Sequence, residues 1–71
     1  MARWIKISYE REKQVYAIDL ERIGAFSISL NGRLTLYLPN NEPLVLTQQS
    51  DPQAYHQILD YIKETTGLVL P

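Results

Sequence analysis

The sequence has 71 residues, with seven Lys or Arg, eight Asp or Glu and a net charge of −1. This length predicts one domain, whose folding buries roughly 60% of the surface of the unfolded chain, and the absence of cysteine excludes a disulfide framework and a thiolate metal site. The small net charge disfavours nucleic-acid binding. The apolar runs are too short for a membrane span, and the N-terminus lacks the apolar stretch of a signal peptide, so we expect a cytoplasmic protein.

The first part of the chain predicts two strands. Residues 3–9 alternate apolar and polar side chains with a period of two, which places Trp4 and Lys6 on the face opposite the isoleucines. Residues 14–18 are rich in strand-forming types and predict the second strand. The segment 19–24 begins with a capping aspartate and ends with glycine, which fits either one helical turn or a bent strand.

A hairpin follows, with strands predicted at residues 25–29 and 33–38. A two-residue loop at Asn31-Gly32 would pair apolar residues of one strand with polar residues of the other. A three-residue loop instead places Ile28 opposite Leu34 and gives the hairpin one apolar face. We therefore predict the longer loop, with the glycine in the left-handed conformation of a bulge.

A fifth strand and one helix complete the predicted elements. Residues 43–47 form the strand, and a helix over residues 52–66 begins after a cap at Ser50 or Asp51 and ends at Gly67. The apolar stripe of this helix consists of Tyr55, Ile58, Leu59 and Ile62.

These elements predict an α+β fold, with residues 1–71 forming a single domain. An antiparallel meander of four or five strands is covered on one face by the C-terminal helix. The tail, residues 68–71, is apolar enough to fold back on the domain or to pair elsewhere. The face that the helix leaves uncovered presents Trp4, Lys6, Arg33, Thr35 and Tyr37.

A resemblance rests on the run from Tyr16 to Ile23, on the Asn31-Gly32 hairpin and on the helix around residues 55–62. In this order the chain resembles small bacterial proteins of unknown function, cyanobacterial ones among them, in which strands precede a helix. The resemblance implies no catalytic motif. A sheet closed by a C-terminal helix also resembles pleckstrin-homology-like domains, although their seven strands need a longer chain, and that likeness implies binding.

Candidate catalytic and metal-binding residues are few. His56, the single histidine, stands four residues before Asp60, so the two share a helix face. One histidine without cysteine makes a poor first shell for zinc or copper. The carboxylates nearest the strand ends, at Asp19, Glu21 and Glu42, have basic neighbours and are typical of exposed ion pairs. We therefore expect no enzyme, no metal and no cofactor.

The uncovered face favours a non-enzymatic protein-interaction module or small accessory protein. Trp4 and Tyr37 would lie at the centre of a contact with a protein partner or with a second copy of the chain, because aromatic residues are enriched in the cores of interfaces. The rings and the charges of Lys6 and Arg33 also fit a single-stranded nucleic-acid binder on the same face. A small-ligand enzyme near His56 is the third alternative.

Overall fold

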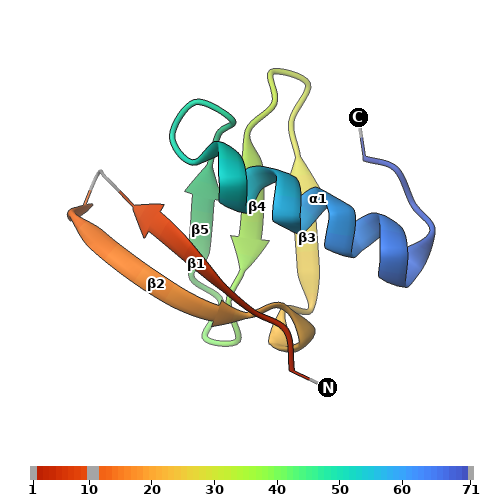
Figure 1. The fold of residues 1–71 in the computed structure, drawn as a ribbon, viewed down its shortest axis with the longest axis horizontal. Coiled ribbons are helices and arrows are strands. Elements are labelled where there is room, and N and C mark those ends of the chain that lie inside the picture. Colours follow the sequence, from red (N-terminus) through yellow and green to blue (C-terminus); the bar gives the residue numbers. More distant parts are fainter. Residues whose placement is uncertain (1, 10–11, 71) are drawn as a thin grey trace.

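The computed structural model describes residues 2–9 and 12–70. In chain order the elements are β1 (Trp4–Tyr9), β2 (Gln14–Asp19), the 3-10 turn η2 (Leu20–Arg22), β3 (Ala25–Ile28), β4 (Leu34–Tyr37), β5 (Pro43–Leu46) and α1 (Pro52–Thr66) (Figure 1). All paired strands are antiparallel, and the helix follows the strands. The predicted α+β fold with a C-terminal helix is therefore confirmed.

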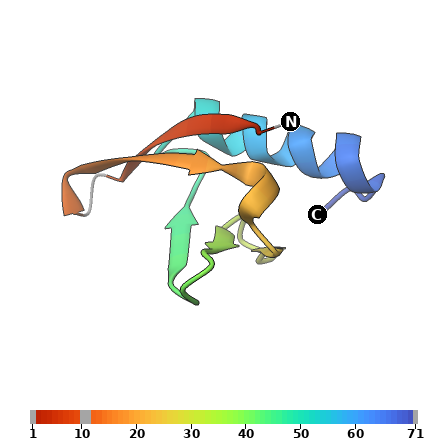
Figure 2. The same cartoon turned by 90° about the horizontal axis from the view of Figure 1, so that it is seen from below.

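The strands form two sheets, where the sequence predicts a single meander. One sheet contains β1 and β2, and the other has the order β3-β4-β5. Figure 2 shows α1 and the β1–β2 hairpin together on one side of the β3–β5 sheet. The buried side chains lie between these two layers, and the largest fully buried ones are Ile7, Leu20, Leu34, Leu36 and Ile58.

The turn η2 separates the two sheets. The Asp19 carboxylate accepts hydrogen bonds from the amides of Arg3 and Glu21, at 3.0 Å each, and so caps the turn. The amide of Ile23 donates to the carbonyl of Leu20 at 3.2 Å. Of the two structures that the sequence allowed for residues 19–24, the helical turn is the one formed, and it redirects the chain from β2 into the second sheet.

The β3–β4 hairpin has the predicted three-residue loop. Ile28 lies opposite Leu34, as the apolar alternation required. The amide of Ser29 donates to the carbonyl of Arg33 at 2.9 Å, and the amide of Gly32 donates back to the Ser29 carbonyl at 2.9 Å. Gly32 has φ +86°, the left-handed conformation of a bulge glycine.

The helix α1 has a local signal at each end. Asp51 is its N-cap, and one carboxylate oxygen accepts from the Ala54 amide at 3.1 Å. The other oxygen accepts from the Ser8 amide of β1 at 2.9 Å, so the same side chain joins the helix to the first sheet. At the far end Gly67 has φ +77°, and its amide donates to the Lys63 carbonyl at 2.9 Å.

The C-terminal tail folds back only in part. Leu70 packs against the core, whereas Leu68 and Val69 are 61% and 76% exposed. Pro71 lies outside the described residues. Within the part of the chain that the structure describes, no helix is both long and apolar enough to cross a bilayer.

Candidate interaction site

The structure distributes the five predicted site residues over two sheets. Trp4 and Lys6 lie on β1, whereas Thr35 and Tyr37 lie on β4, and Arg33 directly precedes β4. The prediction of one shared face assumed a single sheet. Because the sheets lie in different layers around the core, their outward faces are separate surfaces (Figure 2).

The first surface, here called the hairpin face, is the outward side of β1 and β2. It consists of Trp4, Lys6, Val15 and Ala17. Lys6 lies directly opposite Ala17, and the two largest apolar side chains, Trp4 and Val15, are 63% and 65% exposed. The inward side of the same hairpin carries Ile7, which has no exposed surface, so the strand alternates as expected of a half-buried sheet.

A polar groove of about 440 Å³ adjoins the hairpin face, between β1 and the first half of α1. Gln53 and Gln57 line it from the helix, and Trp4 and Lys6 line it from the strand. The Leu20 amide donates to the Arg3 carbonyl, so the odd-numbered residues of β1 bond to β2. The backbone groups of Trp4 and Lys6 therefore point to the opposite edge of β1, toward the groove.

The second surface, here called the sheet face, is the outward side of the three-stranded sheet. It consists of Ala25, Ser27, Thr35, Tyr37, Pro43 and Val45. Tyr37 is 43% exposed, and its hydroxyl lies 3.4 Å from that of Ser27. Thr35 is half-buried, and the one large exposed ring of this surface, Tyr37, is less exposed than Trp4 or Val15 on the hairpin face.

Arg33 belongs to neither surface. It lines a groove of about 300 Å³ between the two sheets, together with Ser8, Tyr9 and the end of β5. Its side chain is exposed. The arginine therefore borders a gap and does not extend the row of Thr35 and Tyr37.

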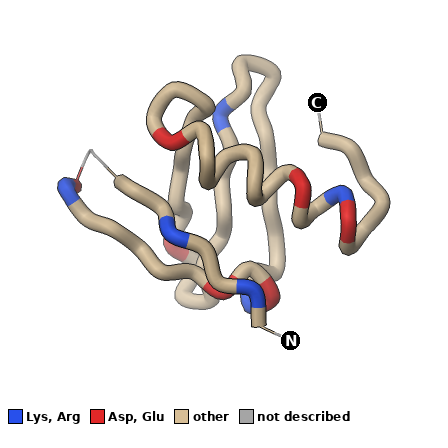
Figure 3. The backbone as a smooth tube through the Cα atoms, in the orientation of Figure 1, with Lys and Arg blue, Asp and Glu red and all other residues tan. Residues whose placement is uncertain are grey.

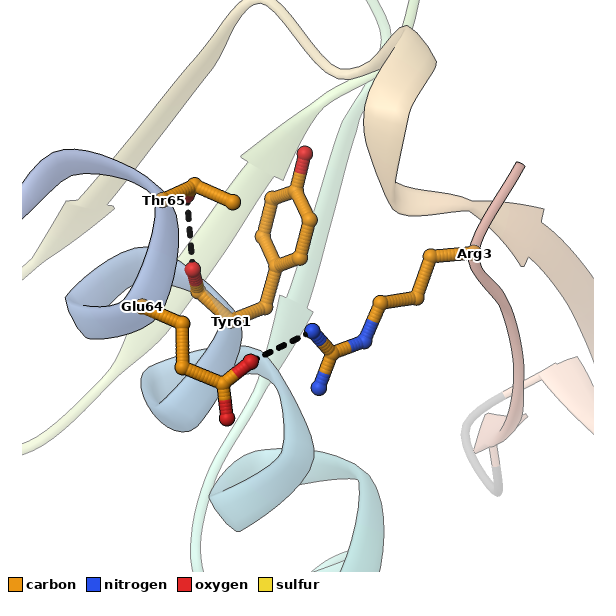
Figure 4. A network of polar contacts seen from close by, with 4 residues as sticks. All are labelled: Arg3, Tyr61, Glu64 and Thr65. Atoms are coloured by element: carbon orange, nitrogen blue, oxygen red, sulfur yellow. Dashed lines mark hydrogen bonds and ion pairs between the residues drawn. The ribbon is translucent and has the colours of Figure 1, made fainter. Parts of the chain in front are cut away.

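Arg3 forms a network beside Trp4 that sequence reasoning missed (Figure 4). Its guanidinium donates to the Glu64 carboxylate at 2.7 Å and lies 5.3 Å from the centre of the Tyr61 ring. The hydrogen bond to Glu64 holds the pKa of Arg3 above its ordinary value. The hydroxyl of Thr65 donates to the Tyr61 carbonyl at 2.6 Å and belongs to the same turn of helix. The network holds the start of β1 against the end of α1 and neutralises a cation next to the hairpin face.

The predicted catalytic candidates do not assemble into a site. His56 is exposed, its ring nitrogen lies 3.4 Å from the Gln48 amide nitrogen, and among the described residues it forms no hydrogen bond or ion pair with Asp60. The buried Asp19 carboxylate is used by backbone amides, and Arg22 lies 4.0 Å away. Within the described ranges, no group of three or more His, Cys, Asp or Glu could hold a metal ion.

The pKa of Tyr16, like that of Arg3, is raised above its ordinary value. Desolvation raises its pKa above the ordinary value, and a hydrogen bond from its hydroxyl to Glu12, at 3.2 Å, raises it further. Its ring packs edge-on against Tyr9, with centroids 5.9 Å apart. The phenol therefore stays protonated at neutral pH and acts in packing.

Comparison of the chain with models of known protein families finds no match, and neither curated proteins nor solved structures show a significant similarity to it.

Proposed function

We propose that this protein is a non-enzymatic protein-interaction module that docks another protein on its hairpin face. The observation that carries the proposal is the exposure of Trp4, at 63%, beside Val15, at 65%, on a sheet surface with no helix over it. A tryptophan is the side chain whose truncation most often costs binding energy at an interface. The adjoining groove supplies the polar rim that such contacts require.

The charges near Trp4 favour a protein partner over single-stranded nucleic acid. Arg3 is paired with Glu64, which leaves Lys6 as the cation of the hairpin face. Tyr37 and Arg33 lie away from Trp4, so the mixture of rings and charges that a base-stacking sheet needs is divided between surfaces. The net charge of −1 supplies no general attraction for phosphates.

The test compares truncation of the ring on each face. Partners captured by the immobilised protein are purified and titrated calorimetrically against the parent, Trp4→Ala and Tyr37→Ala. We expect Trp4→Ala to weaken association by on the order of 2 kcal/mol, because its indole would be buried on binding. Its melting curve should remain that of the parent, because the ring is largely exposed in the free protein.

Tyr37→Ala is the matched control on the sheet face and should bind like the parent. A Trp4→Ala variant with full affinity, or one that unfolds, would remove the hairpin face from consideration. The nucleic-acid alternative is tested with the parent protein and oligothymidylate, since Trp4 is the single tryptophan and its fluorescence reports directly on this face. We expect no change; salt-sensitive quenching would support the alternative instead.

A further inference from the structure

The edge strands of the two sheets differ in how well they are protected from pairing. On the open edge of β5, Pro43 has no amide hydrogen, and the Thr47 amide donates to the Ser50 hydroxyl at 3.0 Å. On the open edge of β1, the Ser8 amide is bonded to Asp51, and Lys6 places a charge on the strand. Proline, charge and local capping are the devices with which proteins block edge-to-edge association.

β3 has none of these devices. Ser29 and Arg33 form a hydrogen-bonded pair, and such pairs alternate with non-hydrogen-bonded pairs along an antiparallel hairpin. The backbone N–H and C=O groups of Phe26 and Ile28 therefore point away from β4. Among the described residues, no hydrogen bond occupies these groups on their outer side. The strand contains neither charge nor proline (Figure 3).

An apolar groove of about 400 Å³ runs beside this edge. Its lining includes Gly24, Phe26, Tyr61, Thr65, Leu68 and Leu70. The rings of Phe26 and Tyr61 lie 6.3 Å apart between β3 and α1, and Leu68 is 61% exposed on the tail. The edge thus combines free hydrogen-bonding groups with an apolar wall, which together suit an extended strand.

We propose that β3 is a homodimer interface, at which a second copy of this chain pairs antiparallel through its own β3. The two three-stranded sheets then become one continuous sheet with twofold symmetry. Because Phe26 and Ile28 supply the free groups, Phe26 of one copy lies opposite Ile28 of the other, and the two Ser27 residues face each other on the axis. This inference goes beyond the proposed function, because the hairpin face takes no part in it.

The exposed tip of the hairpin favours this occupant. An antiparallel pair brings the hairpin end of each copy, residues 29–33, to the η2 end of the other. It therefore places Leu30, an apolar side chain that is 99% exposed at the hairpin tip, beside Gly24 and the apolar groove of the partner. Because the pairing is twofold, it covers an exposed leucine and an apolar groove on each copy.

The open edge of β2 is the competing site. Its outward-pointing residues, Val15 and Ala17, are uncharged like those of β3. None of the three grooves beside the hairpin face, Arg33 and β3 is lined by residues of this edge. Self-pairing at β2 would therefore leave Leu30 and the apolar groove beside β3 exposed.

The test places a lysine on each edge and measures molecular mass by analytical ultracentrifugation over a wide range of concentration. We expect the parent to show a reversible monomer–dimer equilibrium and Ser27→Lys to raise its dissociation constant by at least about tenfold, because two like charges then face each other on the axis. Ala17→Lys is the matched control, an exposed small residue on the β2 edge, and should dimerise like the parent. Both substituted side chains point to solvent in the monomer, and melting curves of the diluted proteins check that the fold is retained.

A mixture of Ser27→Lys and Ser27→Glu should form a heterodimer, since opposite charges then meet on the axis. In the parent, the amides of Phe26 and Ile28 should exchange with solvent quickly when dilute and slowly when concentrated, whereas that of Ser27, bonded to β4, should be protected throughout. A constant monomer mass, a dimer disrupted by Ala17→Lys and not by Ser27→Lys, or concentration-independent exchange at Phe26 would overturn the proposal. Each of these results leaves the test of Trp4 on the hairpin face unaffected.

Discussion

Gly32 holds a backbone conformation, φ +86°, that residues with a β-carbon adopt only under strain. A β-carbon built at this position would lie 3.7 Å from the Tyr55 hydroxyl, so the added atom itself has room. The cost of a side chain at Gly32 therefore comes from the backbone. We expect Gly32→Val to lower the free energy of unfolding by about 1 kcal/mol or more, measured by chemical denaturation, because a β-branched residue resists positive φ most strongly.

Gly24 provides the control for this prediction. It has no positive φ, and no atom lies within 4 Å of the β-carbon that a substitution would add. Gly24→Ala should leave the stability of the diluted protein within about 0.5 kcal/mol of the parent. Equal stability of the two variants would mean that the bulge at Gly32 is not strained by a side chain.

The alternation of apolar and polar side chains was sufficient to predict the register of the β3–β4 hairpin, but it could not predict the contacts of Arg3. The pairing of Ile28 with Leu34 follows from which residues are apolar, because a shift of one residue would expose the whole set. The bond between Arg3 and Glu64 joins residues 61 positions apart, and an arginine near the N-terminus carries no signal of its distant partner. Such contacts depend on how the layers pack, which local pattern does not specify.

At the scale of elements, α1 was predicted over residues 52–66 and has the same bounds in the structure. Its signals are local: a cap at Asp51, a proline in the first turn and a left-handed glycine at the end. Local signals of this kind are sufficient to predict both ends of the helix.

The apolar stripe of α1 leads to a prediction on stability. Ile58 has no exposed surface, so Ile58→Ala should lower the free energy of unfolding by about 2 to 5 kcal/mol, a large part of what so small a domain has.

The adjacent face of the same helix supplies the control. His56 is exposed and its polar contact is the amide of Gln48 at 3.4 Å. We expect His56→Ala to change the denaturation midpoint very little, because a helix favours alanine and the imidazole is not packed in the core. Loss of folding in this variant, or tight stoichiometric binding of a metal ion by the parent, would contradict the surface assignment of His56.

At the scale of the whole molecule, the division into two sheets determined what became of the predicted site. The sequence allowed residues 19–24 to be either a turn or a bent strand, and the turn that forms leads the chain from β2 into a second sheet. Trp4 on β1 and Tyr37 on β4 belong to different sheets and therefore lie on different surfaces. Alternation correctly indicated that both rings point away from the core, but it contains no information on which sheet each strand joins.

The Asp51 carboxylate accepts two hydrogen bonds, of which one is the helix cap and the other joins α1 to the first sheet. One oxygen caps the helix through Ala54, and the other accepts the Ser8 amide from the open edge of β1. Asp51→Ala removes both bonds and should lower the free energy of unfolding by about 2 kcal/mol, since a lost cap and a lost, partly buried hydrogen bond each cost about 1 kcal/mol.

Asp51→Ser separates the two contributions. A serine can still cap the helix, but its single hydroxyl oxygen cannot also reach β1, so we expect this variant to lose about half as much stability as the alanine variant. Hydrogen exchange gives the independent measurement: the Ser8 amide should lose protection in both variants, while that of Ala54 should lose it only in Asp51→Ala. Gln49→Ala, an exposed change in the preceding turn, should alter neither. If Ser8 stayed protected in Asp51→Ser, the carboxylate would not be the link between the helix and the first sheet, and the orientation of the hairpin face would have to depend on the Arg3–Glu64 pair and on core packing alone.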